Sequence, residues 1–156
     1  MKEKFNIISY YLLELNGSKM SPGGLERWCR DYALLANEKG YEVTVYQKAT
    51  KKFEVFLPSG IRIIGISCSP FFRGNFTFSS LVEKNVNRKD PIVFVSQELA
   101  LLKKFDRALS VNHGIWWHGD LPFWKKMYIR RFHFKHIQRM KGIICVDSNY
   151  INWCHT

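Results

Sequence analysis

The chain has 156 residues, of which 46% are hydrophobic and 15% aromatic, so it is long and apolar enough for one folded domain and is not a disordered chain. Its 24 Lys and Arg residues outnumber 13 Asp and Glu residues, and the formal net charge of +11 favours an anionic partner without specifying which one. No apolar run reaches the roughly 18 to 20 residues that a membrane-spanning helix requires. We therefore expect a cytoplasmic protein.

Strand-like and helix-like segments alternate along the chain, which is typical of an α/β protein with a parallel sheet. In chain order we expect a strand at 5–11, a helix at 25–36, strands at 42–46, 53–56 and 61–66, a helix at 78–87, a strand at 92–96, a helix at 98–105, a strand at 108–112, a helix at 121–141, a strand at 142–146 and a helix from residue 150. Residues 1–156 are thus predicted to form a Rossmann-like parallel sheet flanked by helices.

The first strand and the first helix are joined by a loop of about ten residues that ends in Pro22-Gly23-Gly24. The free N–H groups of a helix's first turn and the positive end of its dipole favour an anion, and a residue without a Cβ lets a phosphate approach the backbone. The same three residues also suit a simple tight turn. The residues alone leave both interpretations open.

The four cysteines of the chain are far apart, and none has the spacing of metal ligands. We expect buried free thiols, no metal site and no cofactor. His113 follows the predicted strand 108–112, and such strand ends face the ligand crevice in open α/β sheets. An imidazole there is able to donate a hydrogen bond to a hydroxyl group or, when protonated, to stabilise a leaving phosphate.

Six motifs follow one another in an order found in a known family: Pro22-Gly23-Gly24-Leu25-Glu26, Lys39-Gly40-Tyr41-Glu42-Val43-Thr44-Val45, Gly60-Ile61-Arg62-Ile63, Pro91-Ile92-Val93-Phe94-Val95, Val111-Asn112-His113-Gly114 and Ile144-Cys145-Val146-Asp147-Ser148. In this order they resemble the N-terminal domain of retaining GT-B glycosyltransferases, which use nucleotide-sugar donors. The resemblance covers nearly the whole chain. It implies an acceptor-side Rossmann-like domain that faces a second, donor-binding domain across a cleft.

The resemblance also implies roles for individual residues. Gly23 and Gly24 match the glycine pair that lies against the donor diphosphate or the transferred sugar, and Glu26 matches the acidic residue that usually follows the pair. His113 matches the histidine that lines the catalytic cleft. The implied substrates are a nucleotide-sugar donor and a saccharide or lipid-linked acceptor, in bacterial polysaccharide or glycolipid synthesis.

The family's C-terminal domain carries basic residues for the diphosphate and a pair of glutamates for the donor, and nothing in this chain corresponds to them. We therefore expect the chain to be a fragment of a longer enzyme or a truncated product. On its own it should bind donors weakly and be almost inactive.

Two aromatic segments follow His113. Trp116, Trp117 and His118 lie close to it in sequence, where they predict either an acceptor site that stacks on sugar rings or ordinary core packing. The basic and aromatic segment 124–141 predicts either a helix on the inner face of an anionic membrane or a solvated helix face.

Two other classes of protein compete with the enzyme. The charge and the aromatic residues suit a basic α/β module that binds nucleic acid or a membrane surface without catalysis, but no nucleic-acid-binding motif is present, and we expect no nucleic-acid partner. A dinucleotide-binding Rossmann domain needs G-x-G-x-x-G directly after the first strand and an acidic residue after the second. Neither is found here.

Overall fold

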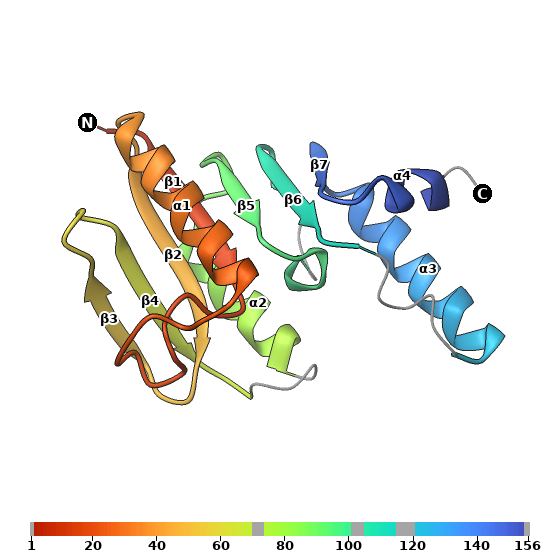
Figure 1. Cartoon of the computed structure of the whole chain (residues 1–156), viewed down its shortest axis with the longest axis horizontal. Helices are drawn as coiled ribbons and strands as arrows, with labels where there is room; N and C mark the ends of the chain where they lie inside the picture. Colours follow the sequence, from red (N-terminus) through yellow and green to blue (C-terminus); the bar gives the residue numbers. More distant parts are fainter. Residues whose placement is uncertain (1, 70–73, 101–104, 115–120, 155–156) are drawn as a thin grey trace.

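The computed structural model describes residues 2–69, 74–100, 105–114 and 121–154, and it shows an α/β fold with a seven-stranded sheet flanked by helices (Figure 1). The elements are β1 (Lys4–Ser9), α1 (Gly24–Glu38), β2 (Glu42–Ala49), β3 (Phe53–Phe56), β4 (Arg62–Ser67), α2 (Gly74–Asn85), β5 (Ile92–Phe94), the 3-10 helix η1 (Gln97–Leu99), β6 (Ala108–Asn112), α3 (Phe123–Ile137), β7 (Gly142–Cys145) and α4 (Ser148–Cys154). In the described ranges no helix combines the length and the apolar character needed to cross a membrane.

The sheet has the strand order β3-β4-β2-β1-β5-β6-β7. All neighbouring pairs are parallel except β3 and β4, which are antiparallel. When the edge strand β3 is set aside, the six parallel strands follow the 3-2-1-4-5-6 order of a Rossmann fold. The predicted fold class is confirmed. Because the chain leaves β1 in one direction for β2 and returns on the other side as β5, the topological switch point lies between β1 and β5.

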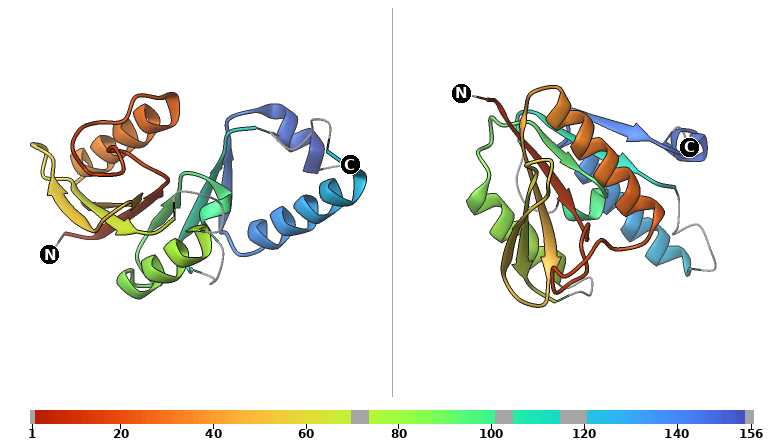
Figure 2. Two further views of the ribbon diagram at one scale, coloured as in Figure 1. Left: turned by 90° about the horizontal axis from the view of Figure 1, so that it is seen from below. Right: turned by 60° about the vertical axis from the view of Figure 1, so that its left-hand side comes forward.

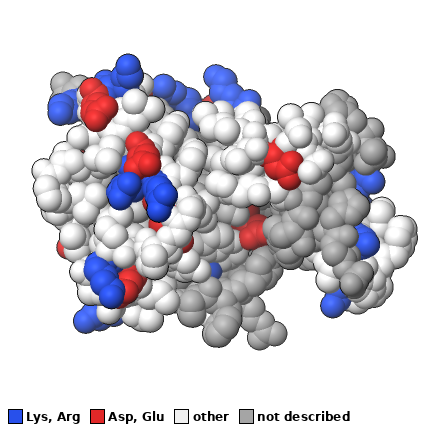
Figure 3. Space-filling view, viewed as in Figure 1, with Lys and Arg blue, Asp and Glu red and all other residues white. Residues whose placement is uncertain are grey.

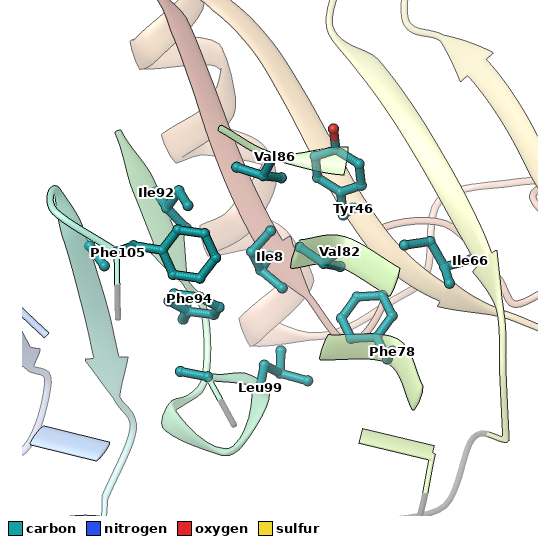
Figure 4. Close-up of a cluster of buried hydrophobic side chains, with 12 residues drawn as sticks. Ile8, Tyr46, Ile66, Phe78, Val82, Val86, Ile92, Phe94, Leu99 and Phe105 are labelled. Atoms are coloured by element: carbon teal, nitrogen blue, oxygen red, sulfur yellow. The ribbon is translucent and has the colours of Figure 1, made fainter. Parts of the chain in front are cut away.

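Helices cover both faces of the sheet, with α1 on one side and α2 and α3 on the other (Figure 2). Successive residues of β1 point to opposite faces, so Ile7 packs in the cluster that contains Cys29 and Ala33 of α1. Ile8 packs in the other cluster, with Phe78 and Val82 of α2 (Figure 4). A sheet covered on both faces explains why its central strands are continuous apolar runs.

Several element bounds differ from those expected. β2 extends three residues beyond the expected strand 42–46, α2 begins at Gly74 and not at residue 78, and α4 begins at Ser148. The expected helix 98–105 is a 3-10 turn over Gln97–Leu99, and residues 101–104 lie outside the described part of the chain. Asn75, in the first turn of α2, is buried, with its amide nitrogen 3.5 Å from the Tyr10 hydroxyl and 3.5 Å from the Glu98 carbonyl oxygen.

The long loop after β1 is held against β2 by one buried side chain, Gln47. Its Oε1 accepts hydrogen bonds from the N–H groups of Leu12 and Leu13, at 2.9 and 2.8 Å, and its amide donates to the Leu13 carbonyl oxygen at 2.9 Å. An antiparallel bridge between Leu13 and Met20 then closes the loop on itself. The loop is therefore ordered, and it delivers the chain to Gly23 at the start of α1.

Candidate functional site

The candidate site lies at the carboxyl edge of the sheet, next to the switch point between β1 and β5. In open α/β sheets a ligand crevice forms outside the strand ends at this point. Here the edge receives the N-terminus of α1, the residues after β5, and His113 and Gly114 after β6. Both predicted parts of the site, the glycine pair and His113, therefore belong to the same edge of the sheet.

The N-terminus of α1 is open at Gly24. Gly23 is the N-cap residue and makes no side-chain cap hydrogen bond, and both glycines are exposed. A Cβ added to Gly24 would have no heavy atom within 4 Å. The first N–H groups of a helix have no partner inside the helix. An anion or a hydroxyl oxygen is therefore able to reach the backbone N–H of Gly24.

The space beside Gly23, unlike that beside Gly24, is occupied by the side chain of Glu26. A Cβ added there would lie 2.0 Å from Oε2 of Glu26, so this carboxylate folds back over the turn. Glu26 is 9% exposed, and no hydrogen bond or ion pair engages it among the described residues. A phosphate would be repelled at this point, whereas a sugar hydroxyl would supply the missing donor. The two glycines therefore differ in what surrounds them: Gly24 is open, whereas Gly23 lies beside the Glu26 carboxylate. The sequence alone shows no such difference.

His113 is exposed and is held in place from two sides. Its Nε2–H donates to the Val95 carbonyl oxygen at 3.0 Å, so Nδ1 is the ring nitrogen that a ligand would meet. Its ring also packs edge-to-face on Trp28, with 6.1 Å between the ring centroids. Because Trp28 lies one helical turn after Gly24, this ring contact ties the predicted histidine to the helix that begins at the predicted glycine pair.

A second carboxylate, Asp147, lies after β7 at the same edge of the sheet, close to Gly114. A Cβ at Gly114 would lie 3.6 Å from Oδ2 of Asp147, while Oδ1 accepts the N–H of Asn149 at 2.9 Å and so caps α4. An Asp before a helix is a common N-cap residue, so the sequence is sufficient to suggest the capping role. The closeness of Asp147 to Gly114 depends on the pairing of β6 with β7, which no local pattern indicates.

A polar cluster below the crevice was also not predicted. The Tyr10 hydroxyl donates to Oε2 of Glu98 at 2.5 Å, and the Lys48 ammonium lies 5.2 Å from the centroid of the Tyr10 ring. Burial, followed by the negative charge of Glu98, raises the pKa of Tyr10, and burial lowers the pKa of Lys48. The sequence feature that could have indicated this cluster is the polar pair Gln47-Lys48, which follows directly after an apolar strand.

A hollow of about 600 Å³ opens next to the long loop. It is lined by Tyr11, Glu14, Leu15, Asn16, Ser21 and Thr50. Pockets of this volume hold small ligands, and the lining combines an aromatic ring with hydroxyl, amide and carboxylate groups. Because Ser21 lies two residues before Gly23, the hollow is close in the chain to the start of α1.

Of the three cysteines whose side chains are described, which are all free thiols, Cys29 is buried as expected, whereas Cys68 and Cys145 are only partly buried. Trp116, Trp117 and His118 belong to the undescribed segment 115–120. The described residues contain no group of three His, Cys, Asp or Glu side chains able to hold a metal ion. Burial raises the pKa of Cys29 to about 12, so this thiol stays protonated and is a core residue rather than a nucleophile.

Comparison of the chain with models of known families gives no match, and comparison with curated proteins gives none either. The resemblance carried by the motifs therefore stays a prediction.

Proposed function

We propose that this chain is the acceptor-side domain of a retaining glycosyltransferase of the GT-B type, which transfers a sugar from a nucleotide-sugar donor to a saccharide or lipid-linked acceptor. The observation that supports this best is the meeting of His113 and the Gly23–Gly24 turn, through Trp28, at the switch point of a Rossmann-like sheet. In the proposal a second domain, implied by the resemblance, binds the nucleotide and neutralises its diphosphate.

The crevice suits the sugar end of such a donor. The Glu26 carboxylate accepts hydrogen bonds and Nδ1 of His113 offers a second polar atom, and the hydroxyl groups of a sugar both donate and accept. The open N–H of Gly24 and the dipole of α1 favour a phosphate oxygen. The sugar would thus be held between Glu26 and His113, with the phosphate at Gly24.

The hollow beside the long loop is the proposed place of the acceptor. The Tyr11 ring offers a face for a sugar ring, and Asn16, Ser21 and Thr50 offer polar groups for its hydroxyls. An acceptor in this hollow would meet the donor near the first turn of α1.

A dinucleotide is less well supported as the ligand, although the strand order is the same in both classes. The ribose of a dinucleotide is recognised by an acidic residue after the second strand. Here β2 ends in Gln47, Lys48 and Ala49, and Gln47 is already engaged with the loop. The residues that follow are Thr50, Lys51 and Lys52, so no acidic residue ends this strand.

The proposal is tested by changing His113 to Ala in the intact protein purified from its host. Release of nucleoside diphosphate is measured over a panel of UDP-, GDP- and ADP-sugars, with saccharide and lipid-linked acceptors. Turnover should fall by about two orders of magnitude, as on loss of a group that contacts the transition state. Stability should fall by only about 1 kcal/mol, for the lost hydrogen bond to Val95.

Arg107→Ala is the matched control, because it removes an exposed ion pair with Glu3 at the opposite, amino edge of the sheet. It should leave turnover unchanged. Full activity in His113→Ala would contradict the assigned role. A loss of activity that is accompanied by a large drop in melting temperature would contradict it as well, because the loss would then follow from unfolding.

A further inference from the structure

The long helix α3 presents its apolar and polar sides in an unusual arrangement. The residues it buries against the protein are His133 and His136. Facing solvent are Phe123, Trp124, Met127 and Tyr128, which are 79, 66, 49 and 70% exposed. A surface helix normally turns its apolar face to the core and its polar face to water. Exposed aromatic residues grouped in this way mark an interaction surface.

The same helix is strongly basic. Phe123–Ile137 contains no acidic residue, and its basic residues are Lys125, Lys126, Arg130, Arg131 and Lys135. Figure 3 shows basic side chains spaced among uncharged atoms at the α3 end of the molecule. A shallow groove of about 560 Å³ runs along the exposed side and is lined by Met127, Tyr128, Arg130, Arg131, Phe134, Lys135 and Gln138.

Cations and aromatic rings alternate closely on this face. The Lys125 ammonium lies 5.4 Å from the Trp124 ring centroid, and the Arg130 guanidinium lies 5.6 Å from that of Phe134. Such pairs combine an apolar ring with a charge that remains in contact with water, which is the composition of side chains at the boundary between lipid headgroups and acyl chains.

We propose that the exposed face of α3, defined by Phe123, Trp124, Met127, Tyr128, Arg130, Arg131 and Lys135, docks on a lipid bilayer that carries anionic headgroups. The basic side chains pair with headgroup phosphates, while the aromatic side chains and Met127 enter the boundary of the acyl chains. The proposal is independent of glycosyl transfer, because it concerns a surface outside the crevice.

A bilayer fits this face better than a nucleic acid does. Both partners supply phosphates for Arg130, Arg131 and Lys135, and aromatic rings also stack on bases. The aliphatic Met127 and the terminal Phe123, 79% exposed, gain most from an apolar phase, which only the lipid offers. Charge and apolar exposure on one helix face therefore point to the same occupant.

The test is sedimentation of the 156-residue chain with vesicles of phosphatidylcholine containing phosphatidylglycerol, compared with phosphatidylcholine alone. Binding is expected to the anionic vesicles at low salt, weaker at high salt and absent from the neutral vesicles. The variants Arg130→Gln/Arg131→Gln and Trp124→Ser/Tyr128→Ser should each lower the partition coefficient by roughly tenfold or more, as loss of two surface charges or two interfacial aromatic residues predicts.

Two control variants match these changes at other sites. Lys51→Gln/Lys52→Gln removes an exposed basic pair between β2 and β3, and Phe56→Ser removes an aromatic side chain that is 63% exposed on β3. Both should bind vesicles like the unchanged chain. The proposal is overturned by no binding to anionic vesicles at low salt, by equal losses in the control and α3 variants, or by α3-dependent binding of an RNA or DNA oligonucleotide without vesicle binding.

Discussion

Gly24 and Gly23 are neighbours in the chain, yet substitution should affect them differently. A Cβ at Gly24 meets nothing within 4 Å, whereas a Cβ at Gly23 collides with the carboxylate of Glu26. The sequence was sufficient to select the glycine pair, because turn residues between a strand and a helix are a local signal. It could not show Glu26 over the turn or Gln47 holding the loop, because each contact depends on a side-chain conformation or on a distant partner.

Gly24→Ala is therefore expected to separate stability from binding. Alanine is the better helix former, so the free energy of unfolding should stay the same or rise by about 0.5 kcal/mol. The affinity for uridine diphosphate should fall by about tenfold, the equivalent of one charge-assisted hydrogen bond that the methyl group obstructs. Calorimetric unfolding and a binding titration measure the two effects. A stable Gly24→Ala variant with unchanged affinity would show that no phosphate approaches this N–H.

At the scale of elements, α3 and α4 are joined at the end of β5 through Gln97. Nδ1–H of His133 donates to Gln97 Oε1 at 2.6 Å, and the Gln97 amide donates to the Tyr150 hydroxyl at 2.9 Å. The sequence predicted both helices, at 121–141 and from residue 150, from their helix-like patterns. It could not predict which side of α3 faces inward, because the helix is aromatic and basic on its exposed side and buries two histidines.

The buried His133 should make the fold sensitive to mild acid. Burial, followed by the charge of His136, lowers the pKa of His133 from 6.5 to about 4. The unfolded chain therefore binds this proton at a higher pH than the folded chain does. The contribution of neutral His133 to the free energy of unfolding is fully present above about pH 6.5. It is lost as the pH drops towards 4, by at most about 1.4 kcal/mol per pH unit for one group.

Urea unfolding between pH 7 and pH 5 measures this effect. His133→Gln should flatten the dependence, whereas Tyr150→Phe should lower stability at every pH and keep the slope, because it removes a hydrogen bond but no group that titrates in this range. Equal free energies of unfolding at pH 7 and pH 5 in the unchanged chain would contradict a lowered pKa of His133 in the folded state.

At the scale of the whole molecule, both the class of fold and the parallel sheet followed from the alternation of strand-like and helix-like segments. The extension of β2 was missed because Gln47 and Lys48 are polar, although both are fully buried in the sheet. The order of the strands sets the switch point between β1 and β5, and with it the edge of the sheet at which His113 packs on Trp28 of α1.

The crevice is tested most directly by a ¹H–¹⁵N NMR titration of the chain with UDP-glucose, GDP-mannose and ADP-glucose at millimolar concentration. At least one of these donors is expected to shift the amide signals of Gly23, Gly24 and Gly114 most strongly, together with the ring signals of His113. Signals from the amino edge of the sheet should remain in place. No shift with any donor, or shifts concentrated away from the carboxyl edge, would contradict a donor site at this crevice.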